Sequence, residues 1–140
     1  MYTLDELKKQ NGEIIELCDV LCVLLKEPSL YNNTYAIELM NQFKEKVWMH
    51  LVFEDNTIYY ELTKHPDDEV SRVVEEFHQS GREIKKQFSN FIRNWKKHVE
   101  SGEEHESIHN ECRDIFTLIR ERVRYENENM FPLVKRLQAA

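Results

Sequence analysis

Two stretches of this chain, 72 positions apart, repeat one helical pattern of residues. In each copy, apolar residues recur at intervals of three and four, which places them on one face of an α-helix. A polar residue and then, four positions later, a glutamate interrupt that face: His50 and Glu54 in the first copy. Buried carboxylates need partners, so we expect a cationic group to meet both glutamates. The aligned residues are Met40, Phe43, Val47, His50, Glu54, Ile58 and Tyr59, and Cys112, Ile115, Ile119, Arg122, Glu126, Met130 and Phe131.

Length and turn residues favour one helical domain. The 140 residues contain only three Gly and three Pro, which suits long helices with short connections. Apolar spacing and breaker residues predict four helices and no strand. The sequence therefore predicts a single domain over 1–140, all-α, folded as an antiparallel up-down four-helix bundle. The expected helices are about 3–27, 34–63, 67–101 and 103–131, the last kinked at Pro132 and continuing to 137.

Polar residues interrupt the apolar face of each predicted helix at a similar depth. In an up-down bundle, the starts of the first and third helices lie beside the ends of the second and fourth. We therefore expect four residues to share roughly one layer, namely Asn11, His50, His78 and Arg122. Polar layers inside four-helix bundles are where metals and cofactors are usually bound.

Two segments carry a resemblance to a known family. Residues 50–60 hold a histidine and a glutamate four positions apart, followed by aromatic residues, and residues 126–132 run from a glutamate to Phe-Pro. In these features the chain resembles the hemerythrin-like (HHE cation-binding) family over nearly its full length. The resemblance implies a four-helix bundle around a metal centre, which in diiron members is held by several histidines and bridging carboxylates.

The metal-ligand set implied by this resemblance is incomplete. Asn11 and Arg122 stand where the family pattern has histidines. Four residues after His78 the chain has Arg82 and not a second ligand, and Gly81 occupies the inward face. With such a set we expect either no cofactor or a single weakly bound metal ion. If the chain is an iron-binding member of the family, that ion is iron. The remaining candidate ligands are His50, Glu54, His78 and Glu126.

Arg122 offers a different partner for the two buried glutamates. A guanidinium presents several N–H donors in a planar fork and keeps its charge at physiological pH. The sequence therefore favours a buried salt bridge of Arg122 with Glu54 and Glu126 in place of the metal. Gly81 costs about 1 kcal/mol relative to alanine inside a helix, which suggests that space is needed beside this site.

The composition of the chain limits the classes of partner it is expected to bind and indicates its cellular compartment. With a net charge of −7 and no basic cluster mixed with aromatic residues, we expect neither nucleic acid nor an anionic membrane as a partner. The longest apolar run, 20–25, is far shorter than a membrane span. No signal peptide is recognisable, and three cysteines without a framework spacing indicate a cytoplasmic protein with reduced thiols. We expect surface positions for the histidines outside the layer, His65, His98, His105 and His109.

Two functional hypotheses follow. The favoured one is a cytoplasmic, non-enzymatic binding or regulatory module with a degenerate metal site and a protein partner, since no nucleophile–base pair, phosphate loop or zinc ribbon is present. A weaker similarity to the regulator of sigma D family, in the His50–Glu54 and Arg122–Glu126 segments, implies a regulatory role too. The alternative is an iron-binding hemerythrin-like metalloprotein that binds or senses oxygen or nitric oxide. A homodimer through an exposed face, around Trp48 or Trp95, is a further alternative.

Overall fold

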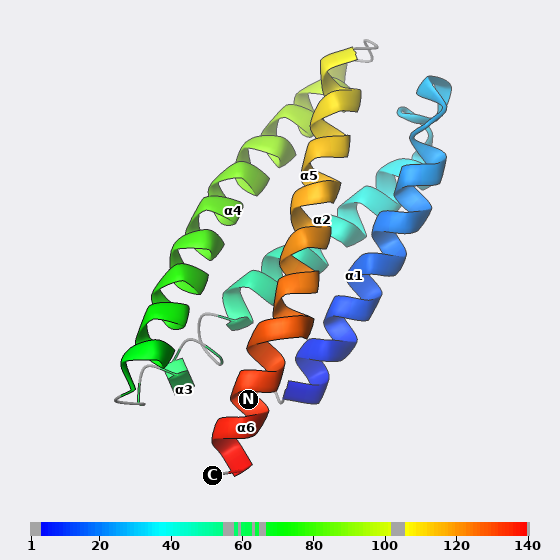
Figure 1. Cartoon of the computed structure of the whole chain (residues 1–140). Helices are drawn as coiled ribbons and strands as arrows, with labels where there is room; N and C mark the ends of the chain where they lie inside the picture. Colours follow the sequence, from blue (N-terminus) through cyan, green and yellow to red (C-terminus); the bar gives the residue numbers. More distant parts are fainter. Residues whose placement is uncertain are drawn as a thin grey trace.

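The computed structural model describes residues 4–54, 58, 60–62, 64, 67–101 and 106–139. Four long helices run alternately up and down over these residues, which confirms the predicted all-α bundle (Figure 1). Helix α1 packs against α2 and α5, and α4 packs against α5 and α2. The long helices are α1 (Leu4–Leu24), α2 (Thr34–Glu54), α4 (Asp68–Ser101) and α5 (Glu106–Tyr125). Shorter elements are η1 (Pro28–Leu30), α3 (Tyr60–Leu62), η3 (Glu126–Met130) and α6 (Phe131–Ala139).

Side-chain caps fix where two of the long helices begin. Asn33 Oδ1 accepts a hydrogen bond from the backbone N–H of Tyr35 at 2.9 Å, at the start of α2. Asp67 Oδ1 accepts one from the N–H of Glu69 at 2.8 Å, at the start of α4. Such caps satisfy backbone donors that the first turn of a helix leaves without partners. For α1 the sequence predicts a capping box of Thr3 with Glu6, and Thr3 lies outside the described residues.

The second and fourth predicted helices each contain described residues that are π-helical and not α-helical. One helix was expected over 34–63. Helix α2 is described to Glu54 and α3 over Tyr60–Leu62, and most of the expected stretch between them lies outside the described residues. Near Pro132, where a kink was expected, the fourth helix continues through the π-helical segment η3 into α6, which extends past the expected end at 137 to Ala139. Since proline cannot donate to the preceding turn, a wider turn before it relieves the clash.

A polar layer divides the bundle core into two apolar clusters. The larger cluster, near the α1–α2 connection, includes Ile14, Leu51, Ile84 and Val123. The smaller one includes Leu7, Ile58, Val74, Phe77 and Met130. Between them lie the buried polar side chains Asn11, His50, Glu54, Arg122 and Glu126.

The larger cluster also covers His98, which was expected at the surface, and Trp95, which the homodimer alternative placed on an exposed face. His98 is only 3% exposed and Trp95 only 4% exposed, because they continue the inward face of α4 beyond Phe88 and Phe91. The prediction of a surface position for His98 is therefore wrong, and Trp95 is too buried to form an exposed dimer face. His109 is exposed, with Nδ1 2.5 Å from the Tyr31 hydroxyl, whereas His65 and His105 lie outside the described residues.

Candidate functional site

The buried polar layer is built from two helix pairs. His50 and Glu54 stand one turn apart near the end of α2, and Arg122 and Glu126 stand one turn apart where α5 passes into η3. One ligand atom each of His50, Glu54 and Glu126 lies within 4.8 Å of the others. Over the described chain this is the one such group of metal-ligand side chains, and His78 on α4 is not part of it.

Arg122 lies between the two glutamates. Its Nη2 donates to Glu54 Oε2 at 3.1 Å, and its Nε lies 3.0 Å from Glu126 Oε2. The third guanidinium nitrogen, Nη1, donates to the backbone carbonyl of Phe77 on α4 at 3.2 Å. The guanidinium carbon also lies 3.7 Å from the centre of the Phe77 ring, within the range of a cation–π interaction. One side chain thus joins α2, α4 and η3.

Gly81 provides the room that this guanidinium needs. A Cβ atom added at Gly81 would lie 3.2 Å from Arg122 Nη2, which is tighter than ordinary contact. The neighbouring turn of α4 carries Phe77, which holds the same guanidinium through its ring and its carbonyl. The absence of a side chain at Gly81 therefore matches the presence of an arginine at 122.

His50 makes its contacts through both ring nitrogens. Its Nε2 lies 2.6 Å from Glu54 Oε1 and 3.0 Å from Glu126 Oε1. Its Nδ1 lies 2.8 Å from the side-chain oxygen of Gln10. Ionised carboxylate oxygens and amide oxygens only accept hydrogen bonds, so with both glutamates ionised both ring nitrogens donate and the ring is an imidazolium. The layer therefore holds two cations, His50 and Arg122, facing two carboxyl groups.

Burial and the contacts described above both shift the pKa values of the side chains in the layer. Burial works to lower the pKa of His50, but Glu54 and Glu126 outweigh it and raise that pKa to about 10. Burial works to raise the pKa of Glu54, yet its hydrogen-bond partners and the nearby cations lower it to about 2. Burial and the adjacent Glu54 raise the pKa of Glu126 to about 8. Glu126 is thus the carboxyl that takes up a proton most readily.

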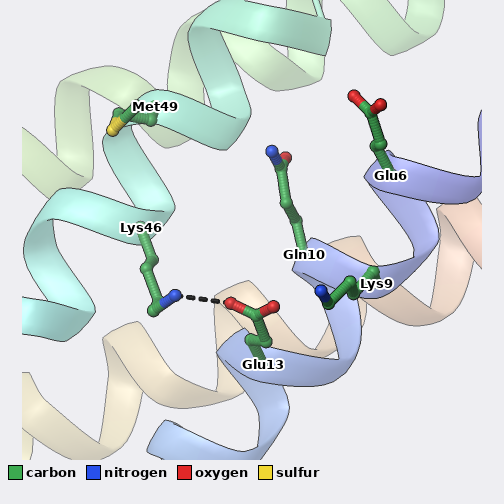
Figure 2. Close-up of a pocket in the computed structure, with 6 residues that line it drawn as sticks. All are labelled: Glu6, Lys9, Gln10, Glu13, Lys46 and Met49. Atoms are coloured by element: carbon green, nitrogen blue, oxygen red, sulfur yellow. Dashed lines mark hydrogen bonds and ion pairs between the residues drawn. The ribbon is translucent and has the colours of Figure 1, made fainter. Parts of the chain in front are cut away.

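Amide side chains complete the layer on the α1 side. Asn11 Nδ2 donates to Glu126 Oε1 at 3.2 Å and lies 3.3 Å from Asn127 Oδ1. Gln10, the partner of His50, lines a surface pocket of about 300 Å³ between α1 and α2. Figure 2 shows Gln10 extending between the two helices, with the Lys46–Glu13 ion pair beside it. Gln10 therefore links the buried layer to the surface on this side, and the exposed Asn127 contacts the layer through Asn11.

Comparison with known proteins places this bundle in a family. The family described as Hemerythrin HHE cation binding domain matches residues 2–134. The chain belongs to this family. No curated protein and no solved structure matches the chain. Membership implies a helical domain built to hold a cation, and His50, Glu54 and Glu126 form a partial site of that kind.

The residues of this hemerythrin domain do not fit a dinuclear metal centre. Among the described residues, the site offers one imidazole and two carboxylates, and the imidazole nitrogen that faces them lies within 3.0 Å of an oxygen of each. Metal ligands must be deprotonated, and the Arg122 guanidinium contacts both carboxylates with a positive charge. A single cation would require Arg122 to withdraw and His50 to lose a proton.

Sequence reasoning missed three contributors to this hemerythrin domain's site. Gln10 and Asn127 were not recognised as partners of the layer, and Phe77 was read only as a core residue. Gln10 carries a usable signal, because it stands 3 residues after Leu7 on the side of α1 that meets α2. Asn127 has no such signal, because its position depends on the π-helical turn of η3.

Proposed function

We propose that this chain is a cytoplasmic, non-enzymatic hemerythrin-family module that binds a protein partner and folds around an internal salt bridge in place of a metal centre. The observation that carries the proposal is the contact of one guanidinium, Arg122, with both Glu54 and Glu126. A metal ion in such a bundle neutralises buried carboxylates and ties helices together. Arg122 and His50 supply both effects from the chain itself.

The charge balance of the layer supports a metal-free core. Above about pH 8, where both glutamates are ionised, two positive and two negative side chains cancel. At neutral pH Glu126 holds a proton, and the ionised Glu54 still contacts both cations. A divalent ion added to this arrangement would lie beside two positive groups, which disfavours its binding. A bundle that keeps its shape in this way offers stable helical faces to a partner.

The thiols support the cytoplasmic part of the proposal. Cys18, Cys22 and Cys112 are free cysteines, and Cys18 and Cys112 are buried in the larger apolar cluster. Persisting free thiols are typical of reducing compartments. Within the described residues, no helix combines the length and apolar character that a membrane crossing requires.

The alternative function is an iron-binding hemerythrin that binds or senses oxygen or nitric oxide. The observation that favours it is the convergence of His50, Glu54 and Glu126, whose ligand atoms lie within 4.8 Å of one another. One imidazole and two carboxylates suit a single divalent transition metal. This reading requires Arg122 to leave its position between the carboxylates.

Elemental analysis separates the two functions. The chain is produced in cells supplied with iron and manganese, purified without chelators, and its metal content is compared with its protein content. We expect colourless protein with less than about one metal ion per ten chains, since Arg122 neutralises the ligands. Near-stoichiometric iron or manganese, lost on Glu54→Gln, would establish the metalloprotein instead.

A further inference from the structure

A second surface feature, far from the pocket over Gln10, is an apolar groove between α2 and α4. It has a volume of about 490 Å³. We call it the Trp48 groove. Trp48 is 43% exposed and Met49 48% exposed, so both side chains present apolar surface to solvent. The lining residues are Lys44, Glu45, Trp48 and Met49 of α2 and Phe88, Ser89 and Ile92 of α4.

The make-up of the groove is typical of a protein-binding surface. Tryptophan in a concave surface is among the residues that contribute most to protein–protein affinity, and methionine adapts its shape to a partner. The other exposed large apolar side chains among the described residues are not part of the groove lining: Val20, Val23, Tyr35 and Tyr60. Trp48 and Met49 are adjacent and share one groove, so they form a patch that a helix can cover.

The flanks of the groove are positively charged on an otherwise acidic chain. Lys85, Ser89, Ile92 and Lys96 follow one another at intervals of four, three and four, so they form one stripe along α4. Arg93 stands next to Ile92, and Lys44 lines the α2 side. Residues 82–97 contain six basic residues and one acidic residue, whereas the chain as a whole carries a net charge of −7. Glu45 is the one acidic side chain in the lining.

We propose that the Trp48 groove binds an acidic amphipathic helix of a partner protein. The apolar face of that helix would cover Trp48 and Met49, while its Asp and Glu residues would face Lys44 and Lys96. Opposite charges around an apolar centre give both affinity and fast association. A second copy of this chain is a poorer occupant, because a symmetric dimer through this groove would bring the same basic flanks together.

This inference names the partner chemistry for the proposed binding module and rests on that proposed function. The groove residues lie outside the buried layer of His50, Arg122 and the two glutamates. The two proposals therefore fail separately. Metal found in the protein would overturn the metal-free core without changing the groove, and a groove that binds nothing would leave the metal content unaffected.

The test uses the full chain and two synthetic helical peptides of about 18 residues, long enough for five turns. Both carry leucines at helical spacing, one with glutamates on its polar face and the other with lysines. We follow the indole N–H signals of Trp48 and of the buried Trp95 by NMR. The expected result is binding of the acidic peptide with a dissociation constant on the order of micromolar, weakened by salt, with the Trp48 signal shifted more than that of Trp95.

Exposed substitutions provide the matched comparison. Trp48→Ala and Lys96→Glu should each weaken acidic-peptide binding about tenfold, whereas Lys135→Glu on α6, with the same change of charge, should leave it within about twofold. Circular dichroism confirms that each variant is folded. Equal binding of the lysine peptide, unchanged binding by Trp48→Ala, or a dimer that Trp48→Ala abolishes would each overturn the proposal.

Discussion

Arg122 Nη2 lies 3.1 Å from Glu54 Oε2 in the interior of the bundle, although 68 positions separate the two residues in the chain. The contact joins the end of α2 to the end of α5, and Glu126 receives the other edge of the same guanidinium. A cation on a side chain is thus placed where other members of the family are expected to hold a metal.

Removing the guanidinium should destabilise the fold strongly. Arg122→Ala leaves Glu54 and Glu126 without that cation in a buried site, a class of change that costs about 3–5 kcal/mol. Urea denaturation followed by circular dichroism measures it. Arg120→Ala is the control, because Arg120 pairs with Asp19 at 2.7 Å on the surface and should contribute no more than about 1 kcal/mol. Equal effects of the two substitutions would contradict the salt-bridged core.

The two helical glycines should respond differently to alanine. Gly12 has open space around its missing Cβ, so Gly12→Ala should stabilise the chain by about 0.5–1 kcal/mol through helix propensity. Gly81→Ala should be at least about 1 kcal/mol less favourable, because the new Cβ meets Arg122 Nη2 at 3.2 Å and the guanidinium is held on its other sides.

A double-mutant cycle tests whether Arg122 is the cause. In the Arg122→Ala background, the penalty at Gly81 should shrink, since the crowded atom is gone, giving a coupling free energy above about 0.5 kcal/mol. Chemical denaturation of the four proteins measures it. An unchanged penalty would mean that Gly81 serves helix packing and not the guanidinium.

Exchanging the arginine for an imidazole should create metal affinity. Arg122→His removes a positive charge from the site and adds a nitrogen ligand to His50, Glu54 and Glu126. Titration with Zn²⁺, followed by calorimetry, should show at least tenfold tighter binding than the parent chain. Arg120→His provides the surface control. If the parent chain binds Zn²⁺ equally well, Arg122 is no obstacle to metal.

Stability should fall as the pH rises above neutral. The folded pKa of His50 is raised from 6.5 to about 10, so its stabilisation is complete below pH 6.5 and is lost as the pH rises toward 10. The folded pKa of Glu126 is raised from 4.5 to about 8, and its stabilisation is lost in the same direction between those values. Urea denaturation at about pH 6.5, 7.5 and 8.5 should show a free energy of unfolding that declines with each step.

A matched variant identifies the groups responsible for that slope. Glu126→Gln keeps the size of the side chain and removes its titration, so the decline between pH 6.5 and 8 should fall to roughly half, with His50 supplying the rest. Melts stop at about pH 8.5 because thiols begin to ionise above it. A stability that rises with pH over this window would show that His50 is neutral in the fold.

The thiols should differ in reactivity. Cys18 and Cys112 are buried, which raises the pKa of each thiol to about 12, while Cys22 is partly exposed with its Sγ 3.6 Å from Arg120. Iodoacetamide labelling followed by mass spectrometry should modify Cys22 first, and the other two only in urea. Labelling of Cys112 at the rate of Cys22 in the native protein would contradict the buried arrangement.

Much of this fold can be predicted from local sequence patterns. The intervals of three and four residues predict the helices, and polar residues on their inward faces, such as Asn11 and Arg122, indicate the depth of the layer. What sequence reasoning could not supply depends on tertiary contacts. His98 looks like a surface histidine until the inward face of α4 is extended to it, and the π-helical turn at Glu126 depends on a proline six residues later.

The division of the core into two apolar clusters has a consequence for how the helices align. An interior lined uniformly with leucine and phenylalanine tolerates sliding of one helix by a turn, because apolar contacts are interchangeable. Here, a shift of α5 by one turn would place the Arg122 guanidinium among apolar side chains. It would also leave Glu54 and Glu126 without their cationic partner. The buried charged side chains therefore allow only one register of the helices.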